Sequence, residues 1–277
     1  MSSPQGDPLD GTLRSSRAAF AAALIGIGIL GLIYGNACEI WESIPKRLPG
    51  RPLVVCLCSL VTLAGGVGLL LRSAVAVSCR VVLALLLLWL VLLKLPPLLR
   101  APQVTVSWES FAETAALSAG AWCLFAARAG TWAKRHLGFA VGPGGITAGR
   151  LLLIAALPMI GVSHFVYHDL TASLVPKWLG FPLGWTYLTG AASIAAAAGM
   201  LFAVVARLAV SLEAAMLWIF TLLVWVPRVA AGPRDQGNWS EILISAAIAS
   251  GAWLVADTYR GVPWLAAGRA ARAVSYV

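Results

Sequence analysis

Eight long apolar stretches constrain the fold of this chain of 277 residues more than any other feature of its sequence. A helix needs about 20 apolar residues to cross the roughly 30 Å hydrocarbon core of a bilayer. The stretches are continuously apolar and do not alternate as barrel strands do, so they predict eight transmembrane helices in an all-α membrane protein. They lie near 18–36, 52–71, 74–95, 109–127, 150–168, 183–204, 206–227 and 240–257.

The composition supports this class. Hydrophobic residues make up 60% of the chain and charged residues 11%, whereas a soluble domain of this length needs far more polar surface. The formal net charge of +9 is not gathered into a basic stripe with interleaved aromatic residues. This distribution disfavours a nucleic-acid partner and leaves the lipid bilayer as the expected surroundings.

The positions of Lys and Arg predict the orientation of the chain. If the N-terminus is cytoplasmic, 12 of the 20 Lys and Arg residues fall on the cytoplasmic side, so the positive-inside rule places both termini there. The 12 residues are Arg14, Arg17, Arg72, Arg80, Arg128, Lys134, Arg135, Arg150, Arg207, Arg260, Arg269 and Arg272.

An internal repeat relates the two halves of the sequence. A shift of 131 positions aligns Pro, Gly and Trp landmarks, and Pro and Trp do not align by chance as apolar residues do. The aligned pairs are Pro45 with Pro176, Gly68 with Gly199, Pro96 with Pro227, Pro102 with Pro233, Trp108 with Trp239 and Gly120 with Gly251. Each copy holds four spans, an even number, so the sequence predicts two parallel four-helix repeats related by an axis along the membrane normal.

The repeat divides the chain into five segments. We predict a cytoplasmic N-terminal tail over 1–17, a first four-helix unit over 18–127 and a Gly-rich, basic cytoplasmic linker over 128–149. The second four-helix unit then covers 150–257, and a cytoplasmic C-terminal tail covers 258–277.

Conserved chemistry within the repeat also predicts local structure. Pro96 and Pro227 are expected to end the third helix of each unit, because proline lacks the N–H that the helical ladder needs. Trp108 and Trp239 are expected to anchor the fourth helix at the interface. Glu109 and Glu241 follow near helix N-termini, where the helix dipole alone explains an acidic residue.

Three segments of the second half resemble a known family, the DoxX-like integral membrane proteins. They are Gly161 to Phe165 (GVSHF), Val175 to Trp178 (VPKW) and Tyr187 to Gly190 (YLTG). The resemblance covers 150–257 well and 18–127 more loosely, since Tyr34 stands where the second half has His164.

The resemblance implies a multi-pass protein of the bacterial inner membrane, acting as an accessory or structural subunit in a redox or quinone-linked process. One branch of the family is associated with thiosulfate:quinone oxidoreductase, so the implied partners are other membrane-complex subunits and the implied cofactor is a quinone. Two alternatives stay open: a small-molecule or lipid transporter working between the halves, and a membrane oxidoreductase with its site in the second repeat.

His164, His168, Asp169 and Glu113 form the candidate small-molecule pocket. The histidines are spaced i, i+4, which puts them on one face of the fifth span. The functional reading is a pocket that binds a quinone carbonyl, a small substrate or a metal; the structural reading is a set of polar residues that caps a helix end. Three histidines in the chain do not complete a metal site, and no catalytic signature appears, so no metal ligand or catalytic residue is assigned.

Glu213 is the candidate intramembrane ionisable residue. It lies about 9 Å beyond Arg207 along the seventh span, and its repeat counterpart is Val82, so the shared scaffold does not require it. An unpaired charge in hydrocarbon is costly. Glu213 is therefore either a proton-relay or binding group, or half of an ion pair with Arg207, Arg80 or Arg72.

Overall fold

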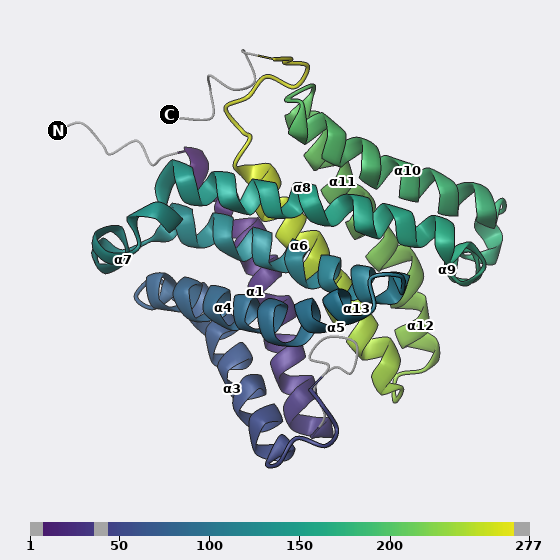
Figure 1. Cartoon of the computed structure of the whole chain (residues 1–277), viewed down its shortest axis with the longest axis horizontal. Helices are drawn as coiled ribbons and strands as arrows, with labels where there is room; N and C mark the ends of the chain where they lie inside the picture. Colours follow the sequence, from purple (N-terminus) through teal and green to yellow (C-terminus); the bar gives the residue numbers. More distant parts are fainter. Residues whose placement is uncertain (1–7, 36–43, 269–277) are drawn as a thin grey trace.

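The computed structural model describes residues 8–35 and 44–268, with side chains from Ser15 onward. Over these residues the protein is helical, and a single bridge between Val204 and Ala267 is its only extended pairing (Figure 1). The all-α prediction is confirmed.

The helices of the first half are α1 (Pro8–Tyr34), α3 (Arg51–Leu70), α4 (Val75–Trp89), the π-helical turn η1 (Leu90–Lys94), α5 (Leu95–Arg100) and α6 (Thr105–Arg128). Two short elements follow, α7 (Thr131–His136) and the 3-10 turn η2 (Gly138–Ala140). The second half contains α8 (Gly142–Val166), α9 (His168–Leu174), the 3-10 turn η3 (Lys177–Leu179), α10 (Pro182–Leu201), α11 (Ala206–Phe220), the π-helical turn η4 (Thr221–Trp225), α12 (Val226–Ala231) and α13 (Gln236–Asp257).

Six helical segments of the described chain are long and apolar enough to cross a membrane, which makes this a multi-pass membrane protein. They are Ser15–Tyr34, Arg51–Leu70, Val75–Arg100, Gly142–Val166, Ala206–Ala231 and Gln236–Asp257. The other two predicted spans lie in α6 and α10, which have 24 and 20 residues. Neither is among the six; α6 carries Glu109 and Glu113, and α10 carries Thr186 and Thr189.

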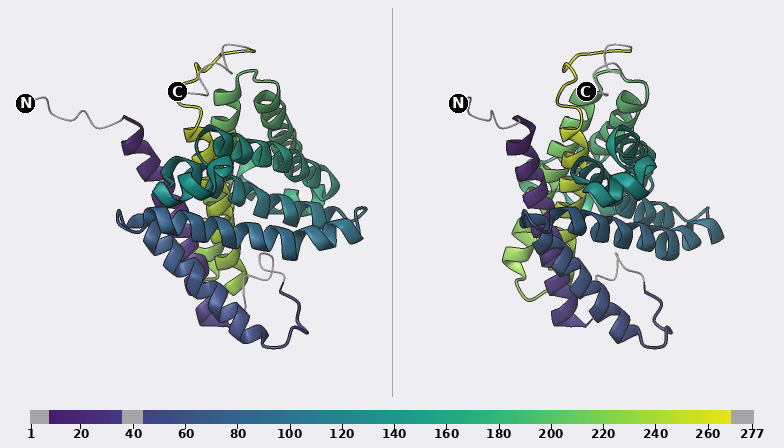
Figure 2. Two further views of the ribbon diagram at one scale, coloured as in Figure 1. Left: turned by 60° about the vertical axis from the view of Figure 1, so that its left-hand side comes forward. Right: turned by 90° about the vertical axis from the view of Figure 1, so that its left-hand side faces the viewer.

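The helices of each half pack in chain order. In the first half α1 contacts α3, α3 contacts α4 and α4 contacts α6, and the second half repeats this order from α8 through α10 and α11 to α13. Between the halves α6 packs on both α13 and α8, and α13 packs on α1; Figure 2 shows α1 and α13 side by side. The first helix of each half therefore packs on the fourth helix of the other, and the two predicted units interlock.

The contact between α6 and α13 depends on two glycines. A Cβ atom on Gly120 would lie only 2.4 Å from the Cα of Gly251, closer than real side chains approach. The crossing of α8 and α10 is similar, since a Cβ on Gly161 would lie 2.6 Å from the carbonyl oxygen of Gly190. Small residues at such crossings let helix backbones approach closely in a membrane.

Two predicted boundaries differ from the structure. Helix α1 begins at Pro8, inside the predicted tail 1–17, and much of the predicted linker 128–149 is helical. Helix α8 already begins at Gly142, with Pro143 in its first turn. Proline suits that position because its missing N–H has no partner in the first turn anyway. The glycine-rich run therefore starts a helix instead of forming a flexible connection.

Pro96 and Pro227 do not end their helices, so that prediction is wrong. The chain stays helical through them to Arg100 and Ala231. A π-helical turn, η1 or η4, comes directly before each proline-containing helix. The π turn changes which carbonyl each N–H meets, so the helix accommodates a residue that lacks an N–H.

Trp108 and Trp239 hold the connections that precede the fourth helix of each half. The indole Nε1 of Trp108 donates to the carbonyl oxygen of Pro102 at 2.6 Å. The indole Nε1 of Trp239 donates to the carbonyl oxygen of Pro233 at 2.9 Å. Each tryptophan thus fastens its loop by a specific hydrogen bond.

The bounds of the elements recur along the chain. After the first helix of each half, five corresponding pairs of elements begin 131 positions apart. The pairs of first residues are Arg51 and Pro182, Val75 and Ala206, Leu90 and Thr221, Leu95 and Val226, and Thr105 and Gln236.

Candidate functional site

A polar cluster lies where η1, α6, α8 and α13 meet. We call it the carboxylate cluster, and its members are Lys94, Glu109, Ser110, Glu113, Ser163 and Glu241. Lys94 is 3% exposed, and its Nζ donates to the hydroxyl of Ser110 at 2.7 Å. The buried hydroxyl of Ser163 donates to Oε1 of Glu109 at 3.1 Å. Helices from both halves of the chain therefore meet through polar side chains.

Electrostatic interactions connect the carboxyl groups of this cluster. Glu113 interacts with Glu109, Glu241 and Lys94. Glu241 in turn interacts with Glu109 and with Arg228 of α12. Three carboxyl groups thus interact with one another, while the buried ammonium group of Lys94 interacts with Glu113 and the guanidinium group of Arg228 interacts with Glu241. When all five groups are ionised, the site carries a net negative charge, which attracts cations.

The helix dipole does not account for Glu109 and Glu241. The first turns of α6 and α13 hold no acidic residue, and both glutamates lie one turn further along. Asp235 caps α13 instead, because its Oδ1 accepts from the backbone N–H of Gly237 at 2.7 Å. An Asp directly before a helix is a standard capping signal, so the sequence could have revealed this cap.

His164 and His168 lie on different helices. Helix α8 ends at Val166, and His168 begins α9, so the assumption of one continuous helix face is wrong. Both histidines nevertheless approach α10: a Cβ on Gly190 would lie 2.9 Å from the Cβ of His164, and the ring centroids of His168 and Tyr187 are 6.1 Å apart. They lie near the end of α8 where it contacts α10.

The four residues of the predicted pocket do not form one group of contacts. His164 Nδ1 forms a hydrogen bond with the carbonyl oxygen of Ile160 at 2.8 Å, one turn earlier in the same helix. His168 Nε2 lies 3.5 Å from Asp169 Oδ1, and the Asp169 side chain is 92% exposed. Glu113 belongs to the carboxylate cluster. Within residues 8–35 and 44–268, no three His, Cys, Asp or Glu side chains are placed to hold a metal ion.

Glu213 is buried in the contact between α10 and α11, with 2% of its surface exposed. Its Oε1 accepts from the hydroxyl of Ser193 at 2.9 Å, while its Oε2 meets no hydrogen-bond partner in the described chain. Among the described residues, the alternative of an ion pair between Glu213 and Arg207, Arg80 or Arg72 is not formed. The Arg207 guanidinium stacks on Trp264 at 4.0 Å, and that of Arg80 stacks on Trp132 at 4.9 Å.

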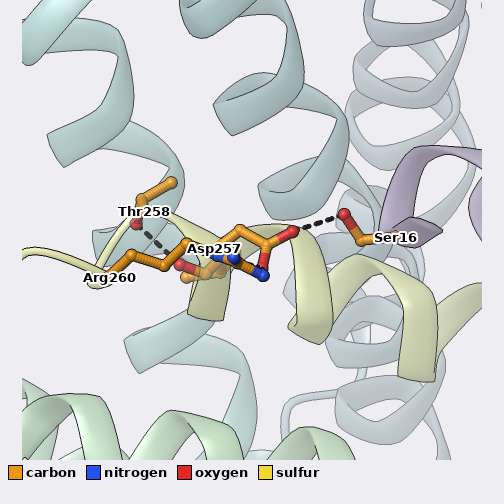
Figure 3. Close-up of polar contacts among 5 residues, drawn as sticks. Ser16, Asp257, Thr258 and Arg260 are labelled. Carbon is orange, nitrogen blue, oxygen red and sulfur yellow. Dashed lines mark hydrogen bonds and ion pairs between the residues drawn. The ribbon is translucent and has the colours of Figure 1, made fainter. Parts of the chain in front are cut away.

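A second polar group joins the two ends of the described chain (Figure 3). Oδ2 of Asp257 accepts from the hydroxyl of Ser16 at 2.5 Å, and Oδ1 accepts from Arg260 Nη2 at 2.7 Å. Arg150 Nε donates to the hydroxyl of Thr258 at 2.9 Å. The start of α1 and the end of α13 therefore lie at the same end of the bundle, which we call the terminal end.

Sequence reasoning singled out Glu113 but predicted neither the carboxylate cluster around it nor the polar group at the terminal end. The spacing of Asp257 and Arg260 is typical of helical ion pairs and could have suggested that contact. The partnership of Ser16 with Asp257 joins residues 241 positions apart, and no local pattern indicates it.

These features define the class of the protein: a multi-pass helical membrane protein with buried ionisable groups near both ends of its bundle. Residues 153–255, from α8 into α13, match a domain of unknown function, DUF8561. No curated protein and no solved structure matches the chain.

Proposed function

We propose that the protein is an eight-span transporter of a small cation, built from two parallel four-helix repeats. The carboxylate cluster carries this proposal. Three carboxyl groups from α6 and α13 interact with one another where helices of both halves meet, and Lys94 interacts with one of them, Glu113. Ionisable groups at membrane depth are costly, so they mark functional sites by default.

The recurrence of the element bounds supports the two repeats. Both π-helical turns and both Trp-to-Pro hydrogen bonds lie at corresponding positions. The family match over 153–255 falls inside the proposed second repeat, 150–257. By analogy with their partners, α6 and α10 then also cross the bilayer, and 24 and 20 residues are long enough for that.

The orientation follows from charge. The Ser16–Asp257 hydrogen bond keeps α1 and α13 together at the terminal end, and the excess of Lys and Arg near that end favours the cytoplasmic side. We therefore propose that both termini are cytoplasmic and that the protein resides in the cell (inner) membrane. The carboxylate cluster then lies toward the opposite face.

The chemistry of the cluster favours a cation over an anion. Its three carboxyl groups outnumber the ammonium of Lys94 and the guanidinium of Arg228, and hydroxyls of Ser110 and Ser163 offer further oxygen atoms. Oxygen ligands suit small hard cations. The backbones of Gly120 and Gly251 lie in close contact between α6 and α13, so a cation that crosses between these helices requires them to move apart there.

Flux through proteoliposomes tests the proposal. We expect purified protein to conduct a monovalent cation, supplied as Na⁺ or K⁺, and Glu113→Gln to lower that flux about tenfold or more, because it removes the carboxyl group that interacts with both other glutamates of the cluster. Asp169→Asn is the matched control, since it neutralises an exposed carboxylate. Absence of cation flux in the wild type, or equal flux in Glu113→Gln and Asp169→Asn, would contradict the proposal.

A second proposal is an accessory or structural role in a redox or quinone-linked complex. It is supported by the DoxX-like segments, of which Gly161 and Gly190 form the tight α8–α10 crossing. Mild-detergent purification followed by mass spectrometry should then recover stable membrane partners or bound quinone. Recovery of neither would remove this second proposal, and a colourless preparation would also remove an oxidoreductase at His164 and His168.

A further inference from the structure

A cavity of about 410 Å³ lies between α11 and α13 near the terminal end of the bundle. Arg207, Asp257, Arg260 and Trp264 line it where α11 begins and α13 ends. Ala215 and Trp218 line it further along α11. This cavity is distinct from the carboxylate cluster, because Glu241 and Asp257 lie near opposite ends of α13.

The cavity has hydrogen-bond donors to spare and few free acceptors. Both carboxyl oxygens of Asp257 already accept, one from Ser16 and one from Arg260. Arg207 donates to the carbonyl oxygen of Val262 and stacks on Trp264, and no carboxylate in the described chain pairs with it. The buried indole N–H of Trp218 has no acceptor there either. A ligand that suits this lining is an anion with several acceptor oxygens.

The lining changes character along α11. Arg207 and Trp218 are eleven residues apart, which is about 16 Å along a helix. The guanidinium groups gather at one end of that distance, while Ala214, Ala215 and Trp218 give the other end an apolar wall. A ligand that matches both ends has an anionic head and an apolar chain.

We propose that this cavity binds an anionic phospholipid, with its phosphate on Arg207 and Arg260 and an acyl chain along α11. Guanidinium groups bind phosphate oxygens through paired, charge-assisted hydrogen bonds. Inorganic phosphate offers the same head chemistry and leaves the apolar wall uncovered. The position of Arg207 at the start of α11 places the phosphate at the depth of lipid headgroups.

Native mass spectrometry of delipidated protein tests this site with three probes: phosphatidylglycerol, phosphatidylcholine and inorganic phosphate. We expect wild-type protein to retain phosphatidylglycerol about tenfold more tightly than phosphatidylcholine, and Arg207→Gln to lose that preference. Arg234→Gln is the matched control, because it removes an exposed arginine from the loop before α13. It should bind as the wild type does.

A second variant addresses the apolar end and leaves both arginines in place. Ala215→Phe fills the cavity beside Trp218, so it should weaken retention of phosphatidylglycerol severalfold. Size-exclusion profiles and thermal unfolding establish that each variant is folded; if Arg207→Gln does not fold, Ala215→Phe decides alone.

Three results would overturn the proposal. The first is equal retention of phosphatidylglycerol and phosphatidylcholine. The second is an Arg207→Gln profile identical to that of Arg234→Gln. The third is binding of inorganic phosphate that phosphatidylglycerol does not displace, since the cavity would then hold a free anion instead of a lipid.

Discussion

The two halves of the chain share their backbone plan and differ in their buried polar groups. Lys94 and Trp225 each end a π-helical turn, and both are buried. Lys94 is the cation of the carboxylate cluster, whereas Trp225 carries an indole. Glu113 likewise corresponds to Ile244, which is also buried. The same local fold thus forms with polar or apolar side chains, so its formation does not require the polar groups of the first half.

At the contact between the second and third helices, the second half has the additional buried polar group and the first half does not. In the second half Ser193 donates to Glu213. The corresponding first-half residues are Thr62 and Val82, and the Thr62 hydroxyl bonds to the carbonyl oxygen of Cys58 at 2.8 Å. A hydroxyl with a purely local partner is therefore sufficient for this packing, and Glu213 is an addition to it.

A cavity between the third and fourth helices also occurs in both halves. In the first half it has about 650 Å³ and is lined largely by apolar residues of α4 and α6 and of the 132–140 segment. Trp122 and Trp253 occupy corresponding places in the two cavities. Two arginines and Asp257 line the second-half cavity, but Arg80 is the only charged residue that lines the other. This difference supports the lipid-headgroup assignment for the second alone.

Among these variants, replacement of Lys94 should lower the free energy of unfolding most. Lys94→Met leaves three carboxyl groups without their buried ammonium partner, and we expect a loss of about 3 kcal/mol in unfolding free energy. The double variant Lys94→Met/Glu113→Gln should recover part of that loss, whereas exposed Lys134→Met should change little. Denaturant unfolding in detergent measures all three. A loss no larger for Lys94→Met than for Lys134→Met would show that the ammonium does not hold the cluster together.

Substitution of Gly120 and of Gly251 by alanine should lower the stability of the protein by different amounts. Gly120→Ala forces a Cβ to within 2.4 Å of the Gly251 backbone, so we expect a destabilisation of about 2 kcal/mol. Gly251→Ala should cost less, because its Cβ meets the nearest atom at 3.0 Å. Thermal unfolding compares them with Gly138→Ala, whose Cβ has no neighbour within 4 Å. Equal stability of Gly120→Ala and Gly138→Ala would argue against the tight crossing.

The tryptophan hydrogen bonds should contribute equally in the two halves. Trp108→Phe and Trp239→Phe each remove one indole N–H donor to a proline carbonyl, and each should cost about 1 kcal/mol. The double variant should show the sum, since the two sites share no partner. Unfolding midpoints in denaturant measure the three variants. A cost confined to one of the two would mean that the loops are not equivalent.

Replacing Glu213 by its first-half counterpart should have the smallest effect. We expect Glu213→Val to change the unfolding free energy by less than about 1 kcal/mol, because the Ser193 hydroxyl can turn to a local carbonyl as Thr62 does. Glu213→Gln, which keeps the shape, is the control in the same unfolding assay. If Glu213→Val costs more than about 2 kcal/mol while Glu213→Gln does not, the carboxyl position has a structural role after all.

Much of the fold could be predicted from the sequence. Each of the eight apolar stretches coincides with a helix, because length and hydropathy alone determine where a helix suits a membrane. The π-helical turns could not be predicted, since Pro96 and Pro227 in isolation indicate a helix end equally well. The interlocking of the halves was also hidden, because α6, α8 and α13 are apolar on several faces.

The candidate site was predicted only in part. Glu113 and Glu213 drew attention as carboxyl groups within apolar stretches, where charge is costly. No role was predicted for Lys94, at the end of the apolar stretch 74–95, yet its side chain is buried, since the helix continues past it to Arg100. The placement of both histidines on one helix is wrong, because the i, i+4 argument requires one unbroken helix and the chain turns at Tyr167, and ligand binding by His164 and His168 stays a prediction.

The crossed packing of the first and fourth helices has a consequence for biosynthesis. Helix α1 leaves the ribosome first, but its partner α13 comes last, so α1 must wait in the membrane beside α3 alone. A ribosome that stalls before Gln236 would leave α1, α6 and α11 each without a neighbour on which it packs in the finished protein. Completion of the bundle is thus delayed until the final helix is inserted, and quality control has that whole interval in which to recognise an unfinished chain.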